Sequence, residues 1–235
     1  MKQNKPKKIS VIIPVFNEEL CIEKLLVHIK NNSSSKNIKE VLVVDGGSTD
    51  KTIFLSERQN VKILHSDKGR AKQMNVGAKN ATGDILYFLH ADTFPPKNFD
   101  TLIIDAFSKN KKTGCFRMKF DSQSNFLQFF AWFTRLNHKI CRGGDQSLFI
   151  CKDLFASMNG FNEDYIIYED GEFIERLYKK TSFSILPEKV TTSARKYEQK
   201  GMLRLQYHFG IIHLKKGLGK SPEELYAYYK RNIAG

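Results

Sequence analysis

The first ninety residues alternate short, mostly apolar runs with segments whose apolar residues recur at helical spacing. Four runs have the length and Val/Ile/Leu content of strands: 9–15, 41–44, 61–64 and 85–89. Three segments between them are predicted helices: 19–30, 49–58 and 71–81. Strands that are apolar on both faces and alternate with helices form a mostly parallel sheet with helices on both sides. The sequence therefore predicts an α/β fold.

Length and composition agree with a single globular domain. The 235 residues are 41% hydrophobic and 27% charged, which is too apolar for a disordered chain. The longest apolar run, 126–133, is eight residues long, whereas a membrane-spanning helix needs about 20. The basic start MKQNKPKKIS leads into a strand-like VIIPV rather than an apolar signal core. The four cysteines have no CxxC spacing, so we expect reduced thiols and a cytoplasmic protein.

The net charge of +13 is concentrated near the end of the chain. Residues 179–235 contain twelve Lys and Arg but four Glu. This excess suits nucleic acid, an anionic membrane or phosphorylated substrates, although such lysines also simply keep a surface soluble. Residues 202–235 are predicted to form a basic helical extension, either at a membrane interface or as a helix pair covering the sheet.

Polar segments follow the predicted strands, at the edge where open α/β sheets bind ligands. In VVDGGSTDKT, Gly46 and Gly47 allow the backbone to approach a bound group closely. Ser48 is predicted to cap the next helix, whose exposed amides suit a phosphate oxygen. Alternatively, Asp45 and Asp50 only satisfy turn and cap amides.

Four segments occur in order along the chain: SVIIPVFNEE, VVDGGSTDKT, GRAKQMNVGAKNATGDILYFLHADT and YEDGEFIERL. Neither a GxGxxG nor a P-loop motif is present. From about 9 to 201 the chain resembles family-2 glycosyltransferases with the GT-A fold, most closely the subgroup associated with radical-SAM and selenium-domain genes. The resemblance implies a single Rossmann-like GT-A domain at 9–201. Its nucleotide half would span about 9–94 and its acceptor half about 95–201, between a basic tail (1–8) and the C-terminal extension.

The resemblance also implies a nucleotide-sugar donor, with UDP the expected nucleotide. Asp45 would bond the base edge, and Arg70 and Asn75 would face the nucleotide, unless Arg70 is only a solvated surface cation. The implied donor-binding residues are Pro14, Val15, Glu18, Asp45, Gly47, Ser48, Asp50, Arg70, Asn75 and Ala91.

Family members carry an acidic metal motif, often Asp-x-Asp, after the fourth strand, where this chain has His90-Ala91-Asp92. Asp92 is a hard oxygen ligand for Mn²⁺ or Mg²⁺, whose octahedron diphosphate and water would complete. His90 departs from the family pattern. It either ligates the metal or packs beneath the site.

The second half of the chain is expected to hold the acceptor site and the catalytic base. Gly144, Asp145 and Gln146 form the implied acceptor region. They follow an aromatic stripe expected to be core, or else to contact a lipid acceptor: Phe126, Phe129, Phe130, Phe133 and Leu136.

Asp170 matches the family's catalytic base, within an acidic pair with Glu169. A base there would accept the acceptor hydroxyl proton in one inverting displacement. Alternatively, both carboxylates only complement a helix dipole. Arg195, with His208 or His213, would stabilise the leaving diphosphate.

The sequence is thus interpreted as a metal-dependent, inverting glycosyltransferase acting on a hydroxyl-bearing lipid or glycan. Three alternatives stay open. A sugar-nucleotide nucleotidyltransferase would be expected to carry a Gly-rich signature that is missing here. A basic nucleic-acid-binding module lacks a recognition helix or an aromatic RNA platform. A nucleotide sensor would bind nucleotide without turnover.

Overall fold

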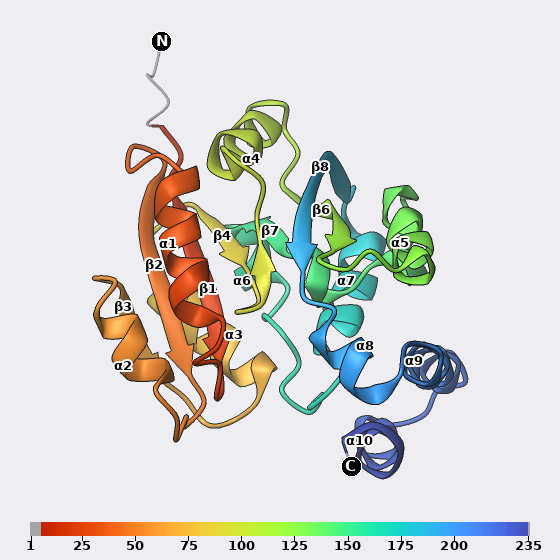
Figure 1. The fold of residues 1–235 in the computed structure, drawn as a ribbon. Helices are drawn as coiled ribbons and strands as arrows, with labels where there is room; N and C mark the ends of the chain where they lie inside the picture. The colour runs from red at the N-terminus through yellow and green to blue at the C-terminus, as the bar shows by residue number, and fades with distance from the viewer. Residues whose placement is uncertain (1–5, 235) are drawn as a thin grey trace.

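A central sheet with helices on both faces forms the body of the computed structural model, which describes residues 6–234 (Figure 1). Within those residues the sheet has eight strands in the order β3-β2-β1-β4-β7-β6-β8-β5. Strands β1 to β4 pair in parallel, β7 is antiparallel to both β4 and β6, and β6 is parallel to β8. The predicted α/β fold class is confirmed. Residues 1–5 of the predicted basic tail lie outside the described residues.

The predicted strands and helices of the first half are all present. The strands are β1 (Ile9–Val15), β2 (Ile38–Asp45), β3 (Lys62–His65) and β4 (Ile85–Phe88). The helices are α1 (Ile22–Asn32), α2 (Thr52–Glu57) and α3 (Arg70–Asn80). Helices α1 and α2 each begin three residues later than predicted, because the loops before them bond to each other instead of continuing the helix.

Strand β1 is buried along its whole length and serves two cores. Ile9, Val11 and Ile13 pack into the core that contains α1, whereas Ile12 points to the other face, against Met74 of α3. Alternate residues of a strand point to opposite faces, so a central strand covered on both sides must be apolar throughout. This is the physical basis of the predicted parallel sheet.

The second half of the chain contains the helices and strands that were predicted from the sequence in least detail. They are α4 (Phe99–Ser108), β5 (Thr93–Phe94), β6 (Thr113–Phe120), α5 (Asn125–Trp132), β7 (Leu148–Cys151), α6 (Lys152–Ser157), α7 (Glu169–Lys180), β8 (Ser184–Thr192) and α8 (Arg195–Lys200). Only α7 was predicted in detail. Its apolar residues Phe173, Ile174 and Leu177 are buried, as expected.

The predicted core stripe on α5 is wrong. The buried residues of this helix are Leu127 and Ala131, which pack in a small cluster with Phe120 and Ala194. Phe129 is 59% exposed and Leu136 is 43% exposed. The helix therefore faces the protein through its small and aliphatic residues and leaves much of its aromatic surface uncovered.

The C-terminal extension is helical, as predicted, but it does not cover the sheet. Helices α9 (Met202–Gly217) and α10 (Pro222–Tyr229) lead into a final π-helical turn, η4 (Lys230–Ala234). Their buried residues form a separate cluster with Tyr165 and Ile167 of the segment before α7. Helix α10 begins with a capping box between Ser221 and Glu224. In the described part of the chain, no helix is long and apolar enough to cross a membrane.

Gly77 should be a sensitive packing position. A Cβ there would collide with Cγ2 of Ile12, where α3 lies against β1. We expect Gly77→Ala to lower the free energy of unfolding by about 1–3 kcal/mol through overpacking, measured by urea denaturation. Gly210→Ala is the matched control, since this glycine in α9 has no atom within 4 Å of its Cβ position. The control should gain about 0.5–1 kcal/mol from helix propensity, and equal losses in both variants would contradict the packing account.

Candidate active site

A cavity of about 910 Å³ lies at the carboxyl end of the parallel strands. One wall is polar and comes from the ends of β1 and β4 and from the starts of α3 and α7: Pro14, Glu18, Arg70, His90, Asp92, Glu169 and Asp170. The opposite wall is largely apolar and comes from α5, the following loops and the C-terminal helices: Phe130, Phe133, Ile140, Tyr197, Phe209, Ile212 and Tyr229. The cavity therefore joins the predicted nucleotide half to the second half of the chain.

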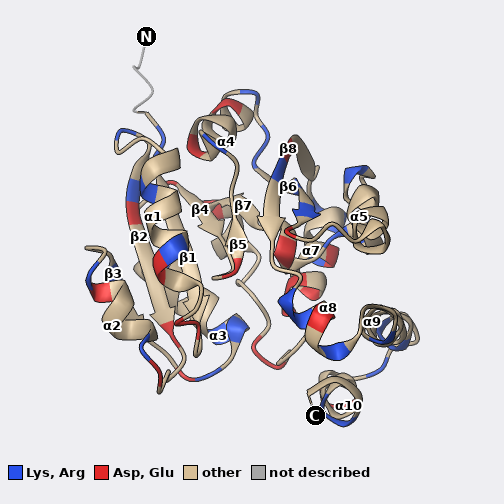
Figure 2. Cartoon of the chain, viewed as in Figure 1, with Lys and Arg blue, Asp and Glu red and all other residues tan. Residues whose placement is uncertain are grey.

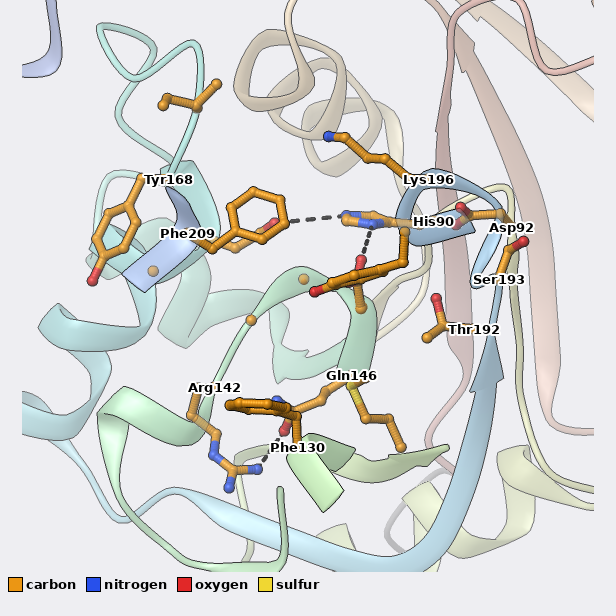
Figure 3. Close-up of a pocket in the computed structure, with 18 of the residues that line it drawn as sticks. His90, Asp92, Phe130, Arg142, Gln146, Tyr168, Thr192, Ser193, Lys196 and Phe209 are labelled. Atoms are coloured by element: carbon orange, nitrogen blue, oxygen red, sulfur yellow. Dashed lines mark hydrogen bonds and ion pairs between the residues drawn. The ribbon is translucent and has the colours of Figure 1, made fainter. Parts of the chain in front are cut away.

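His90 lies at the middle of the polar wall, with a carboxylate at each ring nitrogen (Figure 3). Its Nδ1 is 3.4 Å from Asp145 Oδ1, and its Nε2 is 3.6 Å from Asp170 Oδ2. Burial alone would lower the pKa of His90, but these two carboxylates raise it to about 10. The ring is therefore an imidazolium at neutral pH and holds the two acidic side chains together.

The close approach of these groups depends on Gly144. A Cβ at this position would overlap Asp170 Oδ2 and the Cε1 atom of His90. The neighbouring Gly143, by contrast, has no atom within 4 Å of its Cβ position. Gly144 thus belongs to the predicted acceptor region by position, and its observed effect is to leave room for the contact between His90 and Asp170.

Glu169 and Arg70 form a second ionic group beside the first. Glu169 is fully buried, and its Oε1 lies 2.6 Å from Nε of Arg70, although the contact lacks good hydrogen-bond geometry. Burial raises the pKa of Glu169 to about 7, against the lowering effect of the Arg70 charge. Arg70 is therefore tied to α7 and is not merely a solvated cation. Glu169 is a supporting carboxylate, while Asp170 is the member of the pair beside His90.

Asp92 also lines the cavity and adds to the acidic stretch of its wall. Burial and then the charge of Asp145 raise the pKa of Asp92. Burial and then the charge of Asp92 raise the pKa of Glu18. Mutually repelling carboxylates of this kind would be relieved by a bound cation.

The residues present fit a divalent cation held by one protein carboxylate. No cluster of three or more candidate ligands occurs within residues 6–234. Both nitrogens of His90 face carboxylates, so metal ligation by His90 would require that array to open. The Asp92 carboxylate is not one of the two that His90 faces. A single carboxylate with substrate phosphates and water is a usual arrangement for Mg²⁺.

The predicted donor-binding residues divide into two groups. Pro14, Glu18, Arg70 and Ala91 line the cavity. Val15, Asp45, Gly47, Ser48, Asp50 and Asn75 do not line it. The second group lies at the same sheet edge, and most of its members build the loops around β1 and β2.

The glycine turn after β2 is held by its own aspartate. The Asp45 carboxylate accepts hydrogen bonds from the amides of Gly47 and Ser48, at 3.1 and 3.0 Å. Gly47 has φ of 90°, a conformation that favours glycine. Asp45 thus makes the turn contacts of the alternative interpretation, and base recognition by the same carboxylate stays a prediction.

The predicted capping role of Ser48 is wrong, because α2 begins only at Thr52. The Ser48 hydroxyl accepts a hydrogen bond from the Asn17 amide at 2.9 Å. Asp50 instead accepts the Thr52 amide at 2.9 Å and the Glu19 amide at 3.1 Å. These bonds tie the loop after β1 to the loop after β2.

Asn75, which is predicted to face the nucleotide, does not line the cavity. Its side-chain amide donates to the Phe161 carbonyl and to Glu163, and its Oδ1 accepts the Phe161 amide. These bonds fix α3 to the chain segment that leads into α7. Asn75 therefore positions α7, which carries Asp170, rather than touching a ligand in the cavity.

The remaining predicted residues have mixed environments. Arg195 lines the cavity and lies 3.3 Å from Glu18 Oε2. Gln146 is buried and accepts a hydrogen bond from Arg142 at 2.5 Å, so it supports the loop. His213 lines the cavity beside Tyr168, whereas His208 bonds to Tyr228 and does not line it.

One buried cavity residue, Arg142, was not predicted from the sequence. Arg142 is 4% exposed and also donates to the carbonyl of Thr134, which holds the loop beneath Phe130 (Figure 3). Thr192, Ser193 and Lys196 line the side next to Asp92. Apolar spacing could not separate aromatics facing a cavity from aromatics facing a core, and a buried arginine has no local sequence signal.

The fold and the cavity define an α/β protein with an acidic site at the edge of a mostly parallel sheet. Residues 10–164 match the profile of Glycosyl transferase family 2, which covers more than half of the chain. The chain belongs to Glycosyl transferase family 2.

Two curated relatives of the chain are named for different sugar-transfer reactions. It is 36% identical over 112 residues to dolichyl N-acetyl-alpha-D-glucosaminyl phosphate 3-beta-D-2,3-diacetamido-2,3-dideoxy-beta-D-glucuronosyltransferase of Methanococcus voltae, which is 44% of this chain and 35% of the relative. It is 34% identical over 105 residues to dolichol-phosphate mannosyltransferase of Pyrococcus furiosus, which is 42% of this chain and 30% of the relative. The chain thus spans about a third of the length of these relatives.

Solved structures share the fold over most of the chain. Residues 1–349 of Staphylococcus aureus TarS in complex with UDP match with a TM-score of 0.66 and 26% identity, over 79% of this chain and 60% of that chain. The mannosyltransferase PcManGT of Pyrobaculum calidifontis, in complex with GDP-Man and Mn²⁺, matches with a TM-score of 0.69 over 98% of this chain and 69% of that one. At 20% identity the second match supports the fold alone. The predicted GT-A fold is confirmed.

The arrangement around His90 predicts different effects for two adjacent glycines. Gly144→Ala should push Asp170 away from His90 and so lower the pKa of His90 from about 10, because the partner that stabilises the imidazolium is lost. Gly143→Ala should leave that pKa unchanged, since the added methyl meets nothing. Titration of the His90 ring by NMR, assigned with His90→Gln, measures both. A His90 ring that is neutral at pH 8 in the unchanged protein would contradict the arrangement.

Proposed function

We propose that this protein is an inverting glycosyltransferase that moves a sugar from a nucleotide donor to a hydroxyl-bearing lipid or glycan. The observation that carries the proposal is that Asp92 and Asp170 line one cavity, in which Asp170 faces His90. The proposed metal-binding carboxylate, Asp92, and the proposed catalytic base, Asp170, are therefore two different groups in one site. Membership of the family and the likeness to UDP-bound TarS support the donor class.

Asp170 is the proposed general base. It would accept the proton of the acceptor hydroxyl while that oxygen bonds to the anomeric carbon and the bond to the nucleoside diphosphate breaks. One such displacement inverts the anomeric configuration. His90 would hold the Asp170 carboxylate in place, and Glu169 with Arg70 would anchor the start of α7 beneath it.

The nucleotide half would bind the donor. Pro14, Glu18, Arg70 and Ala91 line the cavity and are proposed donor contacts. The loops carrying Val15, Asp45, Gly47, Ser48 and Asp50 form the adjoining edge, and they are proposed to shape the nucleoside site. UDP is the proposed nucleotide, by analogy with the TarS complex.

Asp92 would hold a divalent cation, either Mn²⁺ or Mg²⁺. Such an ion neutralises charge on a departing diphosphate. Arg195 and Lys196 line the same part of the cavity and would add positive charge there. Asp145 and Gly144 would lie on the acceptor side of His90.

Other features of the proposal rest on the sequence. The motifs favour the radical-SAM and selenium-domain-associated subgroup. The proposed organisation is a nucleotide half to about residue 94, an acceptor half to about residue 201 and a C-terminal extension. The basic C-terminal region supports peripheral contact with an anionic membrane at its cytoplasmic face.

Replacing the proposed base separates chemistry from donor binding. Asp170→Asn should slow the release of UDP from UDP-N-acetylglucosamine, or from the donor that proves active, by at least about 100-fold, as expected for loss of a general base. The rise in melting temperature produced by UDP should be retained, because the base acts on the acceptor. Asp153→Asn, at an exposed position on α6, is the matched control. Full activity in Asp170→Asn would remove this residue from its role.

A further inference from the structure

The strip that lines the apolar end of the cavity also reaches the outer surface. In α5 and the short turns after it, Phe129, Trp132 and Leu136 are 59%, 47% and 43% exposed, and Ile140 is 66% exposed while also lining the cavity. The rings of Phe129 and Trp132 lie 5.1 and 5.5 Å from that of Phe133, which faces the cavity. One continuous apolar strip thus runs from the cavity to solvent.

Helix α9 exposes a second apolar stripe. Leu203, Tyr207, Leu214 and Leu218 are 72%, 64%, 58% and 72% exposed. Their spacing of four, seven and four residues places them on one face of a helix. The opposite face of α9 is the packed one, with Leu205 and Ile212 buried. The exposed stripe therefore lies on the face of α9 that does not pack against the rest of the protein.

Helices α5 and α9, which carry these exposed residues, lie on the side of the molecule away from α1 and α2 (Figure 1). The start of α9 meets the start of α5, where the Ser124 hydroxyl lies 3.3 Å from Met202 Sδ. Both helices contribute walls to the cavity, through Phe130 and Phe209. We name the eight exposed residues of the α5 strip and the α9 stripe the rim surface, because the helices that carry them also contribute walls to the cavity.

Exposed positive charge accompanies the rim surface. Arg135 and Arg204 are exposed, and Lys215 is half-buried. The other nearby cations are engaged: Arg142 is buried, Lys139 pairs with Glu175, and Lys216 bonds to the Tyr165 hydroxyl. Figure 2 shows further Lys and Arg on α8, which also carries Glu198. The Arg135 guanidinium lies 4.6 Å from the centre of the Trp132 ring. Large exposed apolar residues beside exposed cations are typical of surfaces that enter the interface of an anionic membrane.

We propose that the rim surface docks on an anionic lipid membrane and turns the apolar end of the cavity toward it. The inference rests on the proposed function, whose acceptor would then be an amphiphile held in that membrane. The charge argues against a second copy of the chain as the occupant, because two such surfaces would bring like charges together. An anionic bilayer supplies both an apolar layer and the complementary charge.

Vesicle binding tests the proposal with matched variants. The probes are vesicles of phosphatidylcholine with about one-third phosphatidylglycerol, and vesicles of phosphatidylcholine alone. We expect at least about tenfold tighter binding to the anionic vesicles, weakened by salt. Phe129→Ser and Leu214→Ser should each weaken that binding at least about tenfold. Phe54→Ser is the control, since Phe54 on α2 is 58% exposed, close to the 59% of Phe129, and should bind like the unchanged protein.

The outcomes separate docking from catalysis. UDP-induced stabilisation of the same preparations tests the donor site and verifies that each variant is folded. Vesicle binding without a UDP effect would support the docking surface and contradict the proposed function. A UDP effect without vesicle binding, or equal binding by Phe129→Ser and Phe54→Ser, would overturn the docking proposal. A dimer in light scattering that Phe129→Ser dissociates would also overturn it, by assigning the surface to a second copy.

Discussion

The electrostatic arrangement of the site depends on a histidine placed between two carboxylates. Asp145 and Asp170 come from separate parts of the second half of the chain, and His90 follows the last of the parallel strands. An imidazolium there compensates acidic groups that would otherwise repel one another in a partly dry cavity. The contact also joins the nucleotide half of the sheet to α7. It therefore links the proposed metal site to the proposed base.

The rest of the fold supports this contact from several directions. Asn75 fastens α3 to the segment before α7, and buried Glu169 holds Arg70 at the beginning of α3. Gly144 leaves the space in which His90 and Asp170 meet. On the far side, α5 and α9 close the cavity with aromatic walls and leave an apolar, cationic edge outside it. The proposed donor side is thus held by hydrogen bonds and ion pairs, whereas the proposed acceptor side has aromatic walls beside exposed apolar and cationic residues.

The sequence predicted those features that local pattern decides. Strand β1 and the buried face of α1 follow from apolar periodicity, and the residues after each strand were correctly sought at one edge. Ser48 and Asn75 were misplaced because their hydrogen-bond partners, Asn17 and Phe161, are set by tertiary contacts. The aromatics of α5 were misjudged because helical spacing is the same whether a face meets a core, a cavity or solvent. The second carboxylate at His90, from Asp145, was likewise invisible without the fold.

The most direct test of the account is the position of a metal ion in a crystal of the protein with UDP and Mn²⁺, located by anomalous scattering. The account predicts one Mn²⁺ in the cavity, ligated directly by Asp92 and by diphosphate oxygens, with His90 still between Asp145 and Asp170. A manganese ion ligated by His90, or bound away from Asp92, would contradict the division of the site into a metal carboxylate and a separately held base.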